Sequence, residues 1–200
     1  MARLPHWSSL TAIAIMLSGI AVATVIELTK TVELTEFGSV PDFSLVERSG
    51  RNVTLQDLEG QIWVADFIFT GCAGTCPMMT DKMRLLGEEL PEEIRMVSFT
   101  VDPTRDTPEV LTHYAERRGV TGDRWMFLTG GRDELYKLSK EGFHLAVDDT
   151  IGTKIEPITH STRFALVDGE GRIRGYYDGT AMETVAQLAQ DVENLRSERD

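Results

Sequence analysis

The sequence predicts an α/β domain with a central mixed sheet flanked by helices. Two almost continuously apolar segments, residues 61–69 and 94–101, are typical of strands covered on both faces. Each is followed by a segment in which apolar residues recur at helical spacing, residues 76–90 and 108–118. Strands that alternate with helices in this way favour an α/β fold.

The remaining elements extend this pattern at both ends. Residues 163–167 and 172–177 alternate like strands on either side of a glycine-containing turn, which predicts a hairpin. An amphipathic pattern over residues 182–196 predicts a final helix. Shorter elements are expected earlier in the chain: strands at 41–46, 125–128 and 144–147, and a helix at 131–142.

Composition and charge restrict the possible functions. The apolar fraction of 42% and the charged fraction of 26% are those of a globular domain. The 20 basic and 32 acidic residues give a net charge of −12. A surface this acidic repels phosphate backbones, so we expect no nucleic-acid partner.

The N-terminal region predicts export of the domain. Residues 4–26 contain no Lys, Arg, Asp or Glu, which is enough for one helical crossing of a bilayer. We expect a short cytoplasmic or matrix-side tail at 1–9, a transmembrane anchor at 10–26, a linker at 27–39 and the folded domain at 40–200. A cleavable signal peptide is the alternative to the anchor. Either would export the domain, and we expect contact with the membrane through the N-terminal helix only.

The only two cysteines of the chain, Cys72 and Cys76, lie between a predicted strand and a predicted helix. Gly71 and Gly74 permit a sharp turn there, and Pro77 suits the first turn of a helix. A helix N-terminus favours a thiolate. The pair can form a disulfide, attack one, or bind a soft metal. By fold analogy, a dithiol at the end of the first long strand makes the predicted domain thioredoxin-like.

A metal site needs more ligands than two cysteines, since a structural zinc site takes four. His6 precedes the membrane segment, His113 lies in a predicted surface helix and His144 begins a predicted strand. His160 precedes the strand at 163–167, where dithiol enzymes of this fold place a cis-proline. Two thiolates and one imidazole suit copper as Cu(I) or Cu(II). The alternative is that His160 is a structural residue.

Three motifs in order carry a resemblance to a known family. They are Phe69-Thr70-Gly71-Cys72 with Cys76-Pro77, Asp102-Pro103-Thr104-Arg105-Asp106-Thr107-Pro108, and His160-Ser161-Thr162. Over residues 38–196 the chain resembles the Sco/SenC family of membrane-anchored, thioredoxin-like copper chaperones. The resemblance implies that Cys72, Cys76 and His160 are copper ligands. The spacer Ala73-Gly74-Thr75 departs from the proline- and acid-containing spacer often seen in that family.

The resemblance also implies a function and a location. We expect residues 40–200 to be a copper-binding metallochaperone domain, not an enzyme in the strict sense, that delivers copper to the copper centre of cytochrome c oxidase. Its partners would be the copper-receiving oxidase subunit and, further, other copper chaperones or thiol–disulfide proteins. The chain would be single-pass in the inner membrane, with its domain in the periplasm or the mitochondrial intermembrane space.

The alternative is a thiol–disulfide reductase that keeps the copper-ligand cysteines of the oxidase reduced. This activity needs Cys72 and Cys76 as a redox-active pair but does not need His160. A low reduction potential, nearer to thioredoxin than to a strong oxidant, would accompany it.

Charged residues elsewhere in the chain are further candidates for the site. Asp66 stands in an otherwise apolar strand, where burial raises a carboxyl pKa unless a partner compensates. It either acts beside the cysteines, as an outer partner of the metal site or in their redox chemistry, or is a satisfied polar group at a strand end. Asp102, Arg105 and Asp106 either dock a partner or form a turn and helix cap.

Overall fold

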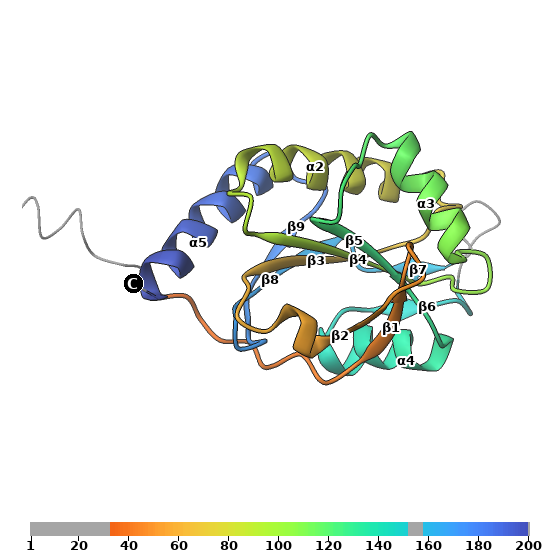
Figure 1. Cartoon of the computed structure of the whole chain (residues 1–200), viewed down its shortest axis with the longest axis horizontal. Coiled ribbons are helices and arrows are strands. Elements are labelled where there is room, and N and C mark those ends of the chain that lie inside the picture. Colours follow the sequence, from red (N-terminus) through yellow and green to blue (C-terminus); the bar gives the residue numbers. More distant parts are fainter. Residues whose placement is uncertain (1–32, 152–157, 200) are drawn as a thin grey trace, which may run out of the picture. The chain divides into compact units, whose positions relative to one another are not determined.

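A seven-stranded mixed sheet organises the fold in the computed structural model, which describes residues 33–151 and 158–199 (Figure 1). The strand order is β2-β1-β5-β4-β3-β8-β9. These strands are β1 (Ser44–Glu47), β2 (Asn52–Thr54), β3 (Trp63–Ile68), β4 (Arg95–Thr100), β5 (Trp125–Thr129), β8 (Arg163–Val167) and β9 (Ile173–Asp178). A separate antiparallel pair is formed by β6 (Val147–Asp148) and β7 (Thr159–His160).

The central strands confirm the predicted mixed sheet. β3 pairs parallel with β4 and antiparallel with β8, and β4 pairs parallel with β5. All six residues of β3 are buried, as the apolar run predicts for a strand covered on both faces. Because β3 and β4 are parallel, the segments that follow them leave the same edge of the sheet.

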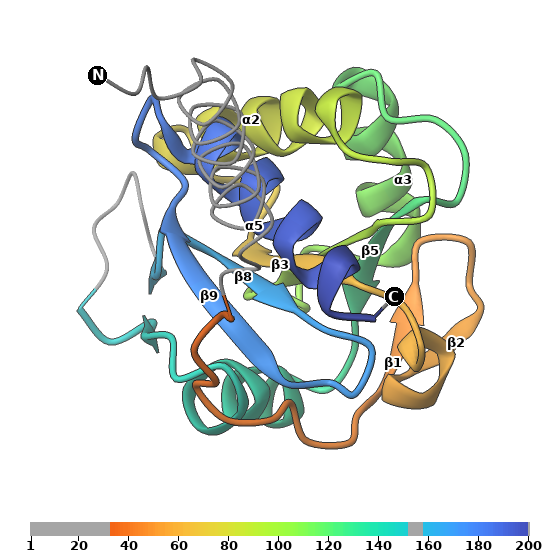
Figure 2. The same ribbon diagram turned by 90° about the vertical axis from the view of Figure 1, so that its left-hand side faces the viewer.

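Helices cover both faces of the sheet, as predicted (Figures 1 and 2). On one face lie α2 (Thr75–Glu89), α3 (Pro108–Arg117) and α5 (Thr184–Arg199), with α2 packed against α5. On the other face lies α4 (Arg132–Lys137), continued by the π-helical turn η2 (Leu138–Gly142). The short 3-10 helix η1 (Leu55–Leu58) connects β2 to β3.

An aromatic cluster fills the core beneath α4. Phe67 and Phe99 stack with ring centroids 5.1 Å apart, and Phe143 meets Phe67 edge-on at 5.4 Å. Trp63 contacts Phe143 from the start of β3 at 5.9 Å. Successive residues of a strand face opposite sides, so Trp63 and Phe67 face α4 while Asp66 faces α2.

Capping residues explain where two helices begin and end. Thr107 accepts a hydrogen bond from Val110 N and Pro108 takes the first helical position, as predicted for the start of α3. The end of α2 is capped from outside the helix: Arg124 donates to the carbonyl oxygens of Gly87, Leu90 and Pro91. No local pattern in the sequence predicts that cap.

The predicted helix at 131–142 and strand at 144–147 are partly wrong. The regular helix ends at Lys137, and the chain continues as the π-helical turn η2. His144 has a φ of +52°, which interrupts an extended segment, so only Val147 and Asp148 pair as a strand. Leu145 instead exchanges two hydrogen bonds with Ser139 at the helix end, through Leu145 N and Ser139 Oγ.

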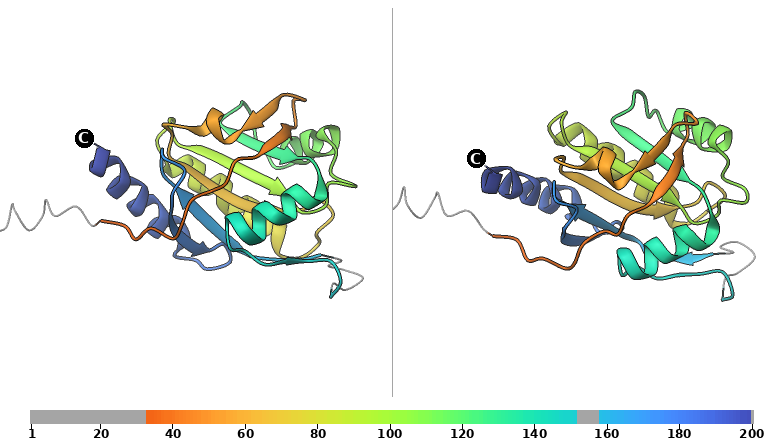
Figure 3. Two further views of the ribbon diagram at one scale, coloured as in Figure 1. Left: turned by 90° about the horizontal axis from the view of Figure 1, so that it is seen from below. Right: turned by 60° about the horizontal axis from the view of Figure 1, so that its bottom comes forward.

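The segment before β1 runs along the edge strand β9 (Figure 3). Phe37 N donates to Ile173 O at 2.8 Å, Ile173 N donates to Gly38 O at 2.8 Å, and Val40 N donates to Gly171 O at 2.9 Å. Backbone groups of β9 that an exposed edge would leave unpaired are thereby covered. The predicted boundary between a linker and a domain at residue 40 stays a prediction.

The predicted tail at 1–9 and anchor at 10–26 lie outside the described residues. Within residues 33–151 and 158–199, no helix has the length and apolar character that a bilayer crossing requires.

Candidate metal centre

The two cysteines lie in the turn from β3 into α2. Cys72 N donates to Phe69 O at 3.3 Å, which closes a turn directly after the strand. Gly74 is the N-cap of α2, so Cys76 lies in the first helical turn, as predicted. Both thiols are free and buried, Cys72 with 7% of its surface exposed and Cys76 with none.

His160 brings a third ligand atom to this turn. Its Nε2 lies 3.1 Å from Cys76 Sγ, and its ring meets Phe69 edge-on. One ligand atom from each of Cys72, Cys76 and His160 lies within 4.8 Å of the other two. The structure therefore brings together the three residues that the resemblance implies as ligands.

The hydrogen bonds of His160 fix which ring nitrogen is free. Nδ1 lies 2.9 Å from Ser161 O, a pure acceptor, so Nδ1 carries the proton. Nε2 then presents its lone pair towards Cys76 Sγ. The ring is held in place because Ser161 N donates to Ala146 O and β7 pairs with β6. This is the tautomer in which a histidine can bind a metal through Nε2.

The two thiols have opposite pKa shifts. Burial raises the pKa of Cys72, but polar contacts with the His160 side chain, with Cys76 and with the Gly74 backbone outweigh it and lower the pKa to about 6. Burial raises the pKa of Cys76 well above its ordinary value, and the nearby Cys72 and Asp66 charges add to this. At neutral pH the pair is therefore one thiolate and one thiol.

Asp66 lies in the middle of β3, fully buried and facing α2. Ser98 Oγ donates to its Oδ1 at 2.6 Å, and Trp125 Nε1 donates to Ser98 Oγ at 2.9 Å. Among the described residues its Oδ2 has no hydrogen-bond partner. Burial raises the pKa of Asp66 to about 7, although the Ser98 hydrogen bond and the charge of His160 act in the opposite direction. It is not a strand-end group, and its role beside the cysteines stays a prediction.

The loop after β4 reaches the same edge of the sheet. Asp102 is largely buried and pairs with the exposed Arg105, whereas Asp106 is fully buried and accepts hydrogen bonds from Thr70 and Thr100. Sequence reasoning left this loop undecided between partner docking and a turn. One signal could have predicted the contact between this loop and Thr70. Thr70 follows β3 and the loop follows β4, and the ends of two neighbouring parallel strands lie at the same edge of the sheet.

The other candidate histidines lie elsewhere. His113 is exposed on α3, with Nδ1 3.3 Å from Glu116 Oε2. His144 lies near Gly38, and neither histidine belongs to the cysteine cluster. His6 lies outside the described residues.

Comparison with known proteins places the chain in a family. The family described as SCO1/SenC matches residues 33–197. The SCO1 protein homolog of Bacillus subtilis is 33% identical over 159 residues, which cover 78% of this chain and 81% of the relative.

Solved structures agree with this assignment. A SCO1/SenC family lipoprotein from Bacillus anthracis superimposes with a TM-score of 0.73 at 31% identity, covering 80% of this chain and 95% of that protein. BsSco, a Sco-family cytochrome c oxidase assembly protein, superimposes with a TM-score of 0.73 at 30% identity, covering 82% and 98%. The fold is therefore the thioredoxin-like α/β fold that the sequence predicts, and the chain belongs to the SCO1/SenC family.

Proposed function

We propose that Cys72, Cys76 and His160 bind copper and that the protein delivers it to the copper centre of cytochrome c oxidase. The observation that carries this proposal is the convergence of two sulfurs and one imidazole nitrogen within 4.8 Å of one another. Thiolates are soft ligands that suit Cu(I), and imidazole binds copper in either oxidation state. Copper is here the cargo, so the site must both bind it and give it up.

Relatives support the choice of metal and of pathway. BsSco is described as a member of a family of cytochrome c oxidase assembly proteins. Yeast Sco1 and Arabidopsis thaliana ScoI, which share the fold at 24% and 23% identity, have each been crystallised with copper bound. These statements concern those proteins, and the donor set of this chain agrees with them.

The geometry prepares two of the three ligands for a cation. The Cys72 thiol has a pKa of about 6 and is ionised at neutral pH. In the neutral imidazole of His160, Nδ1 donates to Ser161 O, so Nε2 has the free lone pair and faces Cys76 Sγ. Cys76 is the ligand that must lose a proton when copper binds, since burial holds its pKa high. Copper binding therefore releases one proton near neutral pH, and affinity increases with pH.

Transfer by ligand exchange requires a partner ligand to reach the metal. Cys72 is the more exposed of the two cysteines, at 7% against 0%. The partner in this proposal is the copper-receiving subunit of the oxidase, which approaches from the Cys72 side and replaces the ligands in sequence.

A membrane anchor at residues 10–26 completes the proposal, with the domain facing the periplasm or the intermembrane space. The uncharged run of the sequence supports it, and one relative from Bacillus anthracis is described as a lipoprotein. Fractionation of cells that express the full chain, followed by carbonate extraction and protease protection, tests it. Release into the soluble fraction with carbonate would exclude the integral anchor.

Copper titration of the full chain in detergent tests the metal site. The native protein is expected to bind one Cu(I), with a Cu(II) form that shows thiolate charge-transfer absorption. H160A should weaken binding roughly 100-fold or more, because it removes one of three ligands from the metal. H113A is the matched control, since that imidazole is exposed and outside the cluster. Equal stoichiometry and affinity in H160A and H113A would remove the three-ligand site.

An oxidase-assembly assay separates copper delivery from the reductase alternative. Both functions are lost with C72S and C76S, because each needs the two sulfurs. Only copper delivery is lost with H160A. Full oxidase assembly in H160A cells would therefore support the thiol–disulfide reductase instead.

A further inference from the structure

Asp106 is a buried carboxylate outside the three-residue cluster, and it holds the turn that leads to Cys72. Its Oδ2 accepts hydrogen bonds from Thr70 N at 3.1 Å and Thr100 Oγ1 at 2.5 Å. Its Oδ1 accepts a third from Thr70 Oγ1 at 2.5 Å. Asp106 has no exposed surface, and none of the ion pairs within the described residues includes it. All of these donors are neutral groups.

Thr70, which lies two positions before Cys72, donates two of these three hydrogen bonds. Thr70 and Gly71 are the central residues of the turn that Cys72 N closes onto Phe69 O at 3.3 Å. Asp106 therefore fixes both the main chain and the side chain of Thr70. With Thr70 fixed, the direction in which the chain enters Cys72 is restricted.

The loop that carries Asp106 is itself rigidly held. Asp106 N donates to Asp102 O at 2.9 Å, and Asp102 N donates to Thr100 Oγ1 at 2.9 Å. Val101 N donates to Ile68 O at 2.8 Å, which ties the end of β4 to the end of β3. Asp106 is thus a fixed acceptor on the scaffold, and the Cys72 turn is the part that it restrains.

We propose that Asp106 is a positioning residue for the metal centre: through Thr70 it sets where Cys72 Sγ lies relative to Cys76 Sγ and His160 Nε2. This inference rests on the proposed copper site. A ligand whose support is loosened samples more positions, and loss of such an outer partner typically weakens metal binding roughly 10- to 100-fold. If Asp106 were only a fold-stabilising residue, its loss would change stability and leave the site unchanged.

The test compares D106A with T107A in the full chain. Thr107 is the neighbouring residue and caps α3, so T107A destabilises the same loop without touching Thr70. Two readouts are needed: Cu(I) affinity by chelator competition, and the rate at which iodoacetamide alkylates Cys72 of the metal-free protein in a C76S background. We expect D106A to bind Cu(I) roughly 10- to 100-fold more weakly and to change the alkylation rate. We expect T107A to change neither.

Two further variants keep the test decisive if D106A does not fold. D106N retains an oxygen for Thr70 N and offers an amide to Thr70 Oγ1, so it should remain close to the native protein in both readouts. T70V removes the hydroxyl but keeps the backbone donor, so it should shift both readouts in the direction of D106A by a smaller factor. Native-like affinity and alkylation in T70V, or equal behaviour of D106A and T107A, would overturn the proposal.

The two readouts distinguish this failure from failure of the proposed function. If the native protein binds no copper, the proposed function is wrong, and the alkylation rates still measure whether Asp106 positions Cys72. If the native protein binds copper and D106A matches T107A, the copper site stands and the role of Asp106 is wrong.

Discussion

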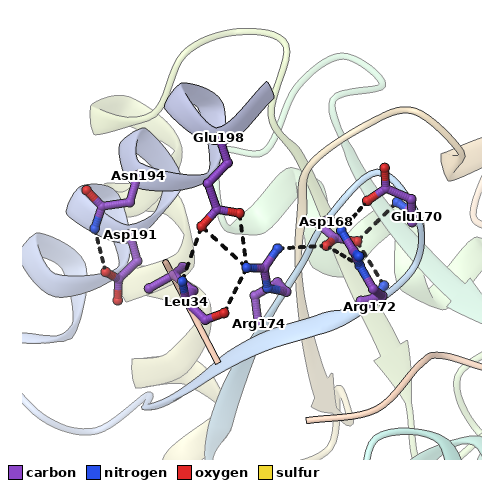
Figure 4. A network of polar contacts seen from close by, with 8 residues as sticks. All are labelled: Leu34, Asp168, Glu170, Arg172, Arg174, Asp191, Asn194 and Glu198. Carbon is purple, nitrogen blue, oxygen red and sulfur yellow. Dashed lines mark hydrogen bonds and ion pairs between the residues drawn. The ribbon is translucent and has the colours of Figure 1, made fainter. Parts of the chain in front are cut away.

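The two ends of the sheet each bury an aspartate, but in different surroundings. At the end where Thr70 leads to the cysteines, Asp106 is buried among hydroxyl and amide groups. At the opposite end, Asp168 is buried against two arginines (Figure 4). Arg174 Nη1 lies 3.0 Å and Arg172 Nε 2.8 Å from Asp168 Oδ2. The pKa shifts follow this difference. Burial raises the pKa of Asp106, while at Asp168 the hydrogen bonds from Arg172 and Arg174 outweigh burial and lower it.

The end of the sheet around Asp168, Arg172 and Arg174 (the arginine end) joins distant parts of the chain. Arg174 Nη2 donates to Leu34 O at 2.8 Å and to Glu198 Oε2 at 3.0 Å, so it ties β9 to the N-terminal segment and to α5. At the other end, around Cys72 and Cys76 (the thiol end), the Cys72 pKa of about 6 gives a thiolate at neutral pH. Burial is the largest cause that raises the pKa of Cys76, and the charges of Cys72 and Asp66 add to it, so this end favours an incoming cation. Charge pairs therefore stabilise the structure at one end, whereas a thiolate favours a cation at the other.

Removing the central cation of the arginine end should have the largest effect on stability. R174M removes the buried partner of Glu198 and one of the two arginines that pair with Asp168. The free energy of unfolding should therefore fall by about 3 kcal/mol. Urea denaturation monitored by circular dichroism measures this. R196M is the control, because Arg196 pairs with Glu93 and Glu193 at the surface and should cost roughly 0–1 kcal/mol. Equal losses in the two variants would contradict the structural role of Arg174.

Neutralising Asp66 should have an intermediate and pH-dependent effect. Burial raises its pKa to about 7, so the ionised form opposes folding once the unfolded chain has ionised. The native protein should therefore lose stability relative to D66N as the pH rises from about 4 to about 7, by roughly 1–3 kcal/mol, and stay level above that.

Asp168 should show the opposite dependence of stability on pH. Its pKa is lowered, so its contribution to stability is present above the unfolded pKa and is lost as the pH falls through the folded value. D168N should thus be less stable than the native protein at pH 7 and approach it in acid. Thermal unfolding over pH 3–9 would show the two curves, and parallel curves for D66N and D168N would contradict the contrast between the two ends.

The smallest effect is expected at Arg172. Its side chain is 38% exposed, and Asp168 keeps Arg174 when Arg172 is removed. R172M should therefore lower the free energy of unfolding by roughly 0–1 kcal/mol, with a dependence on salt. The same urea titration in low and high salt checks this. A loss as large as that of R174M would show that the exposed arginine, not the buried one, compensates Asp168.

Local periodicity in the sequence predicted the core of the fold. The apolar runs that became β3 and β4, and the helical spacing that became α2 and α3, match the structure closely. The predictions were less accurate where tertiary contacts override local pattern. At residues 138–148, hydrogen bonds between Leu145 and Ser139 and the left-handed His144 replace the expected helix end and strand.

For the candidate site, the sequence is sufficient to predict the chemical types of the ligands, because the cysteines, the histidine and their motifs can be identified from local residue order. The contact between Cys76 and His160 joins residues 84 positions apart and was predicted only through fold analogy and family resemblance. Only the three-dimensional arrangement shows that Asp106 contacts Thr70, 36 positions away, and that Arg174 contacts Leu34, 140 positions away. Such contacts depend on which strands are neighbours and in what register, and no local spacing of residues encodes that.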